Sequence, residues 1–341
     1  MTTQAPLMTV RGLTVDFDTG NKFVRALHGV DMEIRRGKTL GVVGESGCGK
    51  SITWLAALGL LGDNARTSGS VVFDGQELVG LSPRRLARLR GSRAALIFQD
   101  PVSALNPVHR IGRQIGEALR LHRGLRGRAA RDEACRLLDR VGISNAAQRL
   151  DEYPHELSGG LNQRAMIAMA LAGEPDILIA DEPTTALDAT IQAQILDLLR
   201  ALTAEMGMAM VLISHDLGVI ADMADRVAVM YSGRVIEEAP ADTLFSTPAH
   251  PYTRGLLAAL PDLDGPRRRL DAIPGSVPAP NALPPGCAFA PRCAHRMAVC
   301  DTAPPRLREG PAAPGQRAAC ERLEALMHRP EPAHEKERTH A

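Results

Sequence analysis

Short apolar runs alternate with longer, mixed segments over the first 240 residues of the chain. The runs with the length and composition of buried strands are Thr39–Val43, Ala94–Phe98, Ile177–Ala180 and Met210–Ile213. The segments predicted to be helical include Ser51–Leu61, Leu161–Leu171 and Ile191–Ala204. Strands that alternate with helices predict an α/β fold with a largely parallel sheet. In such a sheet, ligands bind at the carboxyl ends of the strands.

This pattern changes twice further along the chain. From Pro101 to about Pro154 no convincing strand appears, and we predict a mostly helical insertion. Beyond Pro240, proline and glycine become frequent, above all in Pro274–Pro291, which predicts a loop-rich extension. The last ten residues are charged and polar, a composition typical of disorder.

Composition adds limits on location and partners. The 341 residues exceed a single domain of roughly 150 residues. The net charge of +1 gives no general electrostatic reason to bind nucleic acid, and we predict no such partner. Because there is no apolar run of ~20 residues and no signal-peptide pattern at the N-terminus, we expect a cytoplasmic chain.

Arginine is concentrated between Arg84 and Arg131, a stretch with twelve arginines and only two acids, Asp100 and Glu117. The first interpretation is a solvated helix surface. The second is a face held near anionic lipid headgroups. Nucleic-acid binding is disfavoured because Phe98 is the one aromatic residue interleaved with the arginines.

The clearest chemical motif is GESGCGKS at Gly44–Ser51, which matches G-x-x-x-x-G-K-[ST] in full. It follows an apolar strand and precedes an apolar helix, as a phosphate-binding loop requires. The glycines let successive backbone N–H groups face phosphate oxygens, and the helix N-terminus adds its positive dipole end. Lys50 is then predicted to contact the β- and γ-phosphates and Ser51 to bind Mg²⁺, while Cys48 serves as a small spacer.

A second motif, ILIADE, ends the predicted strand at Ile177–Ala180 with two acids. Asp181 is placed to hold the Mg²⁺ shell, and Glu182 to accept a proton from the attacking water. Alone, the motif is more typical of a strand that ends in a solvated acidic turn. The phosphate-binding loop upstream favours the catalytic interpretation.

A third motif, LSGGLNQR at Leu157–Arg164, places two glycines and a serine before an apolar helix. It offers another helix N-terminus to an anion, although Ser158 is also a good helix cap. A second phosphate-binding element in one chain makes sense if it serves the nucleotide of another chain. We therefore predict a dimer in which each chain completes the other's site.

Taken together, these motifs resemble the ATP-binding subunits of ABC transporters, and LSGGLNQR resembles the signature of that family. Family members often carry methionine where this chain has Leu161. The resemblance implies that Gln99, in IFQD, contacts Mg²⁺ and reports the state of the site to the membrane subunit. It implies that Asp188 crosses the dimer interface and that His215, in ISHD, holds the γ-phosphate and the water in line.

The resemblance fixes the remaining expectations for the site. The adenine of ATP stacks on an aromatic residue upstream of the loop, and Phe17 is preferred over Phe23 because it ends the strand LTVDF. The predicted nucleotide-binding residues are Phe17, Gly44, Glu45, Ser46, Gly47, Cys48, Gly49, Lys50, Ser51 and Gln99. The catalytic residues are Glu182, His215 and Lys50; the Mg²⁺ ligands are Ser51, Gln99 and Asp181; the signature that acts on the partner's nucleotide comprises Ser158, Gly159, Gly160 and Gln163.

Four of the six cysteines lie in the C-terminal region: Cys287, Cys293, Cys300 and Cys320. Their spacing, C-x5-C-x6-C-x19-C, differs from the paired C-x2-C of common zinc sites. Soft thiolates select iron–sulfur clusters or zinc. The string GCAFAPRC resembles the C-terminal domain of dipeptide-importer ATPases, some of which carry a 4Fe–4S cluster, so a 4Fe–4S cluster is expected here, with Zn²⁺ as the alternative.

The strings QDPVSALNP, YPHELSGG and HPYTRGLLAALP resemble the oligopeptide and dipeptide importers. The implied fold is a RecA-like P-loop ATPase core with an antiparallel β edge, a helical subdomain and a C-terminal cysteine-rich, loop-rich extension. The expected domains are a nucleotide-binding domain at 1–240 with a helical subdomain at about 101–158, the extension at 241–330, and a disordered tail at 331–341.

The implied function is ATP hydrolysis that drives import of short peptides or related small solutes. The expected partners are a second ATPase subunit (a paralogue or a second copy), two transmembrane permease subunits and an extracytoplasmic solute-binding protein. The expected location is the cytoplasmic face of the cell membrane. The alternatives are a soluble ABC ATPase not tied to transport and a regulatory subunit that binds ATP without hydrolysing it, which the intact Glu182 and His215 argue against.

Overall fold

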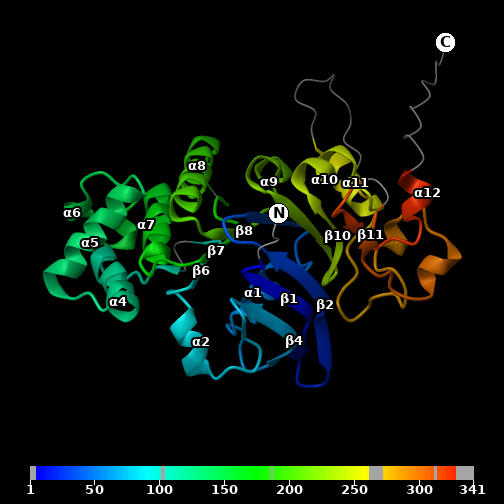
Figure 1. Ribbon diagram of the computed structural model, residues 1–341, viewed down its shortest axis with the longest axis horizontal. Coiled ribbons are helices and arrows are strands. Elements are labelled where there is room, and N and C mark those ends of the chain that lie inside the picture. The colour runs from blue at the N-terminus through cyan, green and yellow to red at the C-terminus, as the bar shows by residue number, and fades with distance from the viewer. Residues whose placement is uncertain (1–4, 101–103, 186, 261–271, 311–312, 328–341) are drawn as a thin grey trace, which may run out of the picture.

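The computed structural model describes residues 5–100, 104–185, 187–260, 272–310 and 313–327 (Figure 1). The tail predicted at 331–341 lies outside these residues. In the described part of the chain, no helix is both long enough and apolar enough to cross a membrane.

An eight-stranded sheet forms the centre of the molecule, with strand order β11-β12-β10-β9-β3-β8-β7-β6 (Figure 1). Its five parallel strands are β9 (Arg226–Tyr231), β3 (Thr39–Val43), β8 (Ala209–Ile213), β7 (Ile177–Asp181) and β6 (Ala94–Ile97). The four strands predicted from apolar runs are therefore correct to within one residue at each end. They are recognisable because both faces of this sheet are covered, so nearly every position is apolar.

The remaining strands are antiparallel. At one edge of the central sheet are β10 (Arg234–Pro240), β12 (Arg317–Ala318) and β11 (Arg308–Glu309). A separate four-stranded sheet comprises β2 (Phe23–Ile34), β1 (Met8–Asp18), β4 (Ala65–Phe73) and β5 (Gln76–Glu77). The strands β11 and β12 come from the predicted loop-rich extension, so the C-terminal region continues the central sheet.

Helices pack against both faces of the central sheet. Those of the core are α1 (Lys50–Ala57), α2 (Pro83–Leu89), α7 (Gly159–Leu171), α8 (Ala189–Met206) and α9 (Leu217–Met223). The predicted insertion contains α4 (Ile111–Arg123), α5 (Gly127–Arg140), α6 (Ala146–Arg149) and the 3₁₀ turn η1 (Pro154–Glu156). The C-terminal region contains α10 (Ala241–Ser246), α11 (Pro251–Ala258), η2 (Ala290–Arg292), η3 (Ala298–Asp301) and α12 (Leu323–Met327).

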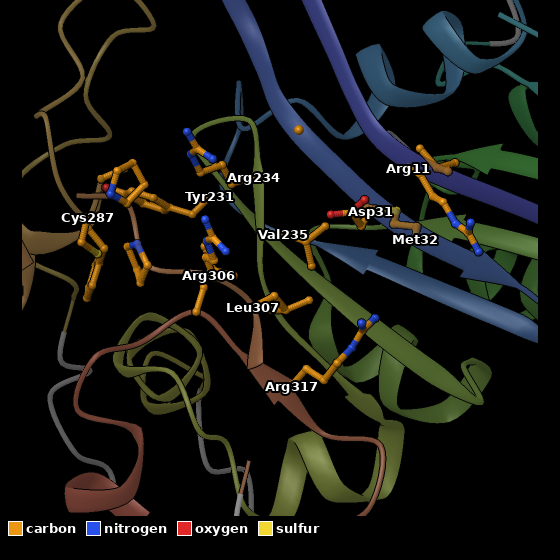
Figure 2. A pocket seen from close by; sticks show the side chains of 18 of the residues that line it. Arg11, Asp31, Met32, Tyr231, Arg234, Val235, Cys287, Arg306, Leu307 and Arg317 are labelled. Atoms are coloured by element: carbon orange, nitrogen blue, oxygen red, sulfur yellow. The ribbon is translucent and has the colours of Figure 1, made fainter. Parts of the chain in front are cut away.

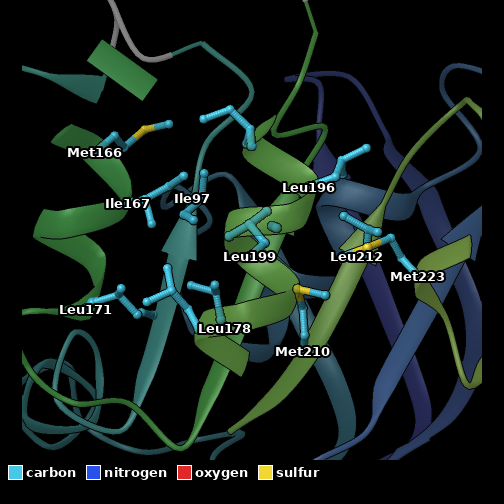
Figure 3. Close-up of a cluster of buried hydrophobic side chains, with 14 of the residues drawn as sticks. Ile97, Met166, Ile167, Leu171, Leu178, Leu196, Leu199, Met210, Leu212 and Met223 are labelled. Carbon is cyan, nitrogen blue, oxygen red and sulfur yellow. The ribbon is translucent and has the colours of Figure 1, made fainter. Parts of the chain in front are cut away.

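Two hydrophobic clusters lie on opposite faces of the central sheet. Alternate residues of each strand point to opposite faces, so Leu178 and Leu212 join the cluster beneath α7 and α8 (Figure 3), whereas Ile179 and Val211 join the cluster beneath the antiparallel sheet. Trp54, fully buried in α1, belongs to the second cluster. Because α1 is packed into this core, the loop that precedes it is held firmly.

Some arginines of the arginine-rich stretch form ion pairs with acids from other elements. Arg93 pairs with Asp74 and with Asp176, and Arg131 pairs with Asp151. The charges of these two arginines are therefore balanced within the protein.

Candidate functional site

The phosphate-binding loop joins the carboxyl end of β3 to α1, and its glycines are required by its geometry. Gly44 has φ +149°, and a Cβ added there would lie 2.3 Å from the carbonyl oxygen of Met230. Gly49 has φ +102° and caps the N-terminus of α1. Lys50, which is buried, donates from Nζ to the carbonyl oxygens of Gly44 (2.7 Å) and Glu45 (3.2 Å). The loop therefore curls around its own lysine, with the helix N-terminus behind it.

Asp181 ends β7 and lies next to the loop. Burial raises the pKa of Asp181, while a hydrogen bond from Ser51 opposes the increase in that pKa. The hydroxyl of Ser51 and the carboxylate of Asp181 are therefore in contact, and both are oxygen ligands of the kind that Mg²⁺ prefers. This donor set fits the predicted Mg²⁺ site, to which Gln99 could add its amide oxygen.

Glu182 has an unusual backbone for a residue with a side chain, with φ +48°. Its N–H donates to the carbonyl oxygen of Ile213 at 3.0 Å, which anchors the turn to the neighbouring strand β8. Its Oε2 accepts hydrogen bonds from Gln99 Nε2 at 2.9 Å and from Thr185 Oγ1 at 3.0 Å, and lies 3.4 Å from His215 Nδ1. Three residues that are 83, 3 and 33 positions away in sequence thus converge on one carboxylate oxygen.

The structure brings Gln99, Glu182 and His215 together at one end of the sheet. Gln99 follows β6, Glu182 follows β7 and His215 follows β8, so they extend from the carboxyl ends of adjacent parallel strands. Thr185 was not predicted, because a threonine in a TT pair carries no distinct sequence signal.

The LSGG segment lies at the N-terminus of α7. Ser158 is exposed, and its Oγ accepts from the N–H of Leu161 at 3.4 Å, as a helix cap does. Gln163 differs from the other predicted signature residues because it is buried, and its amide donates to the carbonyl oxygen of Pro183 at 2.6 Å. In this conformation the side chain of Gln163 links the signature helix to the turn that carries Glu182.

Asp188, predicted to cross a dimer interface, caps α8 by accepting from the N–H groups of Thr190 (3.1 Å) and Ile191 (3.0 Å). Gly159 lies beside this turn, since a Cβ added to it would be 3.8 Å from Leu187. The signature and the Asp188 turn are therefore neighbours on one face of the chain.

The two candidate adenine-binding aromatics lie in different environments. Phe17 is half-buried against the cluster beneath the antiparallel sheet. Phe23 is 45% exposed, with the guanidinium of Arg66 4.1 Å from its ring centroid. The preference for Phe17 stays a prediction.

The four C-terminal cysteines, Cys287, Cys293, Cys300 and Cys320, line one small cavity together with His250 and Phe289. Burial raises the pKa of the thiols of Cys287, Cys293 and Cys320, the last to about 11. Among the described residues, no three or more His, Cys, Asp or Glu side chains are arranged so that they could hold a metal ion. The structure thus gathers the predicted ligands without arranging them as a metal site.

A separate cavity of about 670 Å³ lies between the antiparallel sheet, β10 and the C-terminal region (Figure 2). Arg11, Arg234, Arg306 and Arg317 line it, together with Asp31. No residue of the phosphate-binding loop lines this cavity, so it is not the nucleotide site.

The site thus combines a loop that can bind phosphates with two acids, Asp181 and Glu182, at the end of β7. Gln99 and His215 contact Glu182. Such a combination is typical of a P-loop ATPase. Residues 27–185 match the family model described as ABC transporter, and residues 236–300 match the model described as oligopeptide/dipeptide transporter, C-terminal region.

The similarity to known proteins covers most of the chain. A putative peptide import ATP-binding protein of Brucella abortus is 55% identical over 297 residues, which cover 87% of this chain and 90% of that protein. The oligopeptide transport ATP-binding protein OppD of Salmonella typhimurium is 48% identical over 308 residues, covering 89% of this chain and 92% of OppD. A solved dimeric ATP-binding cassette in a post-hydrolysis state, bound to ADP and Pi, is 28% identical with a TM-score of 0.62, covering 69% of this chain and 98% of that one.

The chain therefore belongs to the ATP-binding proteins of the ABC transporter family, in the group that carries the oligopeptide/dipeptide transporter C-terminal region. It is an ATPase with the α/β fold of the ABC cassettes.

Proposed function

We propose that this chain hydrolyses ATP to drive the import of short peptides, or related small solutes, through an ABC importer. The observation that carries the proposal is the convergence of Gln99, Thr185 and His215 on the carboxylate of Glu182, beside a complete phosphate-binding loop. Relatives named for peptide import and oligopeptide transport support the choice of substrate class. They do not favour the alternative of a soluble ABC ATPase not tied to transport.

Each residue has a defined part in the proposed reaction. Lys50 and the loop N–H groups bind the phosphates. Ser51, Asp181 and Gln99 would hold Mg²⁺, which would supply positive charge to balance that of the phosphates. Glu182 accepts a proton from the attacking water, and His215 holds that water and the γ-phosphate in line. Phe17 stacks on the adenine.

The site is completed by a partner chain in this proposal. Ser158, Gly159 and Gly160 of one ATPase subunit contact the nucleotide bound to the phosphate-binding loop of the other, and Asp188 lies at the interface between them. The second subunit is a paralogue or another copy of this chain. Two permease subunits and an extracytoplasmic solute-binding protein complete an importer, with the ATPase bound peripherally at the cytoplasmic face of the inner membrane.

The proposed organisation keeps three parts: a nucleotide-binding domain at 1–240 with a helical subdomain at about 101–158, an extension at 241–330, and a tail at 331–341.

For Cys287, Cys293, Cys300 and Cys320 we propose a 4Fe–4S cluster, with Zn²⁺ as the alternative. Thiol chemistry and the shared cavity support it. An absorption spectrum with iron and sulfide analysis of anaerobically purified protein tests it, and colourless protein with one zinc would contradict the cluster.

The decisive experiment on the reaction is Glu182→Gln. We expect this variant to bind ATP as the wild type does and to lose turnover by at least a factor of ~10², since it removes the proton acceptor alone. Phosphate release measures turnover, and a fluorescent ATP analogue measures binding. Lys50→Ala is the contrasting variant, which should weaken nucleotide binding itself. A Glu182→Gln protein with near wild-type turnover would show that the assignment of the base is wrong.

A further inference from the structure

Two residues from the C-terminal region contact the phosphate-binding loop at Glu45, the second residue of the motif. The N–H of Glu45 donates to the hydroxyl of Tyr252, in α11, at 2.9 Å. The carboxylate of Glu45 accepts from Arg292 Nη1 at 3.0 Å and 3.1 Å. These contacts span 207 and 247 residues of sequence. Both the backbone and the side chain of Glu45 are therefore held from outside the nucleotide-binding core.

Arg292 is placed to hold the loop firmly. Its side chain is only 6% exposed. Besides Glu45, its guanidinium donates to the carbonyl oxygens of Pro274 (2.8 Å) and Ile273 (3.4 Å) and to the hydroxyl of Tyr231 (3.3 Å). Among the described residues, Glu45 is the carboxylate paired with this guanidinium, and a buried charge that loses its partner is costly. The ion pair is therefore unlike an exposed salt bridge, which contributes little.

The hydroxyl of Tyr252 is fixed by an aromatic cluster. Tyr252 packs edge to face against Tyr231, with ring centroids 4.7 Å apart, and against Phe289, with centroids 5.4 Å apart. All three rings are buried. Since the ring cannot shift without disturbing this packing, its hydroxyl offers the loop an acceptor at a set position.

Glu45 connects these residues to the catalytic lysine. Its carbonyl oxygen accepts from Lys50 Nζ at 3.2 Å, so the same residue touches Lys50 on one side and Tyr252 and Arg292 on the other. A change in the position of Glu45 would therefore change the position from which Lys50 meets a phosphate.

We propose that Arg292 and Tyr252 are positioning residues for the nucleotide, which set the phosphate-binding loop through Glu45. The C-terminal region then forms part of the ATP site, and ATP affinity depends on how that region is folded. Arg292 directly precedes Cys293, so the cysteine cavity is one residue from this contact. The inference rests on the proposed function, because it assumes that the loop binds ATP.

A double-mutant cycle tests the link. The variants are Arg292→Gln, Glu45→Gln and the two combined, in the full chain. We expect each single variant to raise the dissociation constant of a fluorescent ATP analogue, and the KM for ATP, by about tenfold, with a smaller change in kcat. The dissociation constant of the double variant should be no higher than that of the single variant that binds less tightly, because both changes break the same contact. Arg296→Gln, which removes the exposed pair with Asp301 in the same region, is the control and should leave affinity within about twofold.

Tyr252→Phe is a milder test that deletes one hydroxyl and keeps the ring, so it remains informative if Arg292→Gln fails to fold. We expect the dissociation constant to rise by about three- to tenfold with the melting temperature nearly unchanged. Arg292→Lys keeps the charge but loses the planar set of donors of the guanidinium. Its dissociation constant should therefore lie between those of the wild type and of Arg292→Gln.

Two results would overturn the inference. One is unchanged ATP affinity in Tyr252→Phe and Arg292→Gln, even with lower melting temperatures, since the contacts would then be merely structural. The other is a double variant whose fold-increase in dissociation constant equals the product of the two single-variant increases, since the two changes would then act independently. Failure of the wild type to bind the analogue would instead count against the proposed function.

Discussion

Glu182 is held in a conformation that few side chains adopt. A non-glycine residue in the left-handed region costs of order 1–3 kcal/mol and persists only where its surroundings determine it. Here the N–H is bonded to Ile213 in β8, and the side chain is bonded to Gln99 and Thr185. The strained turn thus directs the carboxylate of Glu182 towards Gln99 and His215, which follow β6 and β8. Sequence alone placed the acid after the strand but gave no sign of this turn.

His215 provides a test at the residue scale. Its side chain is 67% exposed, so replacing it with alanine leaves no cavity. We expect His215→Ala to lower kcat by a factor of ~10²–10⁴ with little change in melting temperature, because only the alignment of the reacting groups is lost. Steady-state phosphate release and thermal unfolding measure the two quantities. His155→Ala, at another exposed histidine, should retain full activity, and a fully active His215→Ala protein would exclude the proposed role.

Cys48 lies inside the phosphate-binding loop and is fully buried. Burial raises the pKa of its thiol, and the nearby Lys50 only partly opposes this increase in pKa. Since the thiolate is the reactive form, we expect Cys48 to resist iodoacetamide at pH 7.5 in the folded protein and to react after unfolding in guanidinium. Peptide mass spectrometry measures the labelling. Rapid labelling of Cys48 in the native state would contradict its role as an inert spacer.

At the scale of elements, the start of α11 joins the C-terminal region to the sheet. His250 caps α11 by accepting the N–H of Tyr252 on Nδ1 at 3.0 Å. Glu237, buried in β10, accepts from the N–H groups of Ala249 and His250, each at 2.8 Å, and from Gln316 Nε2 at 3.0 Å. One strand residue therefore holds both the helix that carries Tyr252 and the segment leading to β12.

His250 gives this junction a pH dependence. Burial lowers the pKa of His250 to about 3, whereas an unfolded histidine has a pKa near 6.5. As the pH falls from about 6.5 towards 3, the unfolded state takes up a proton that the folded state does not, so stability is lost across this window. At pH 5.5 the loss attributable to His250 is about 1.4 kcal/mol.

His250→Asn keeps an oxygen that can cap α11 and removes the titrating group. We expect the melting temperature of the wild type to fall more between pH 7.5 and pH 5.5 than that of the variant. Both proteins keep Glu237, whose pKa burial also shifts, so the comparison isolates His250. An equal decrease in melting temperature in the two proteins would contradict a lowered pKa of His250 in the folded state.

The elements that were predictable are those with a strong local signal. The parallel strands are covered on both faces, so Ile177–Ala180 and Ala209–Ile213 are continuous apolar runs. The strands β11 and β12 have only two residues each, and Arg308, Glu309 and Arg317 give no apolar pattern. Their pairing depends on β10, which is far away in sequence, so no local pattern could indicate it. The contact of Arg292 with Glu45 is hidden for the same reason.

At the scale of the whole molecule, one chain carries two elements suited to phosphate. Gly44–Ser51 binds the nucleotide in our proposal, while Ser158 and Gly159 stand exposed at the N-terminus of the 13-residue helix α7. Gly160 must stay without a side chain, because a Cβ there would lie 2.9 Å from Ile191. An exposed helix N-terminus at which Gly159 and Gly160 carry no side chain is well suited to a nucleotide held by another chain.

Complementation between variants tests this shared site. Lys50→Ala disables the phosphate-binding loop, and Ser158→Arg blocks the signature with a bulky side chain; we expect each protein alone to be nearly inactive. In a mixture, a dimer of the two variants contains one site with both wild-type elements, because each site takes its loop from one chain and its signature from the other. We therefore expect the mixture to hydrolyse ATP well above the sum of the two separate rates, with wild-type protein at the same total concentration as the reference. A mixture no faster than that sum, while the wild type is active, would contradict a site shared between copies of this chain.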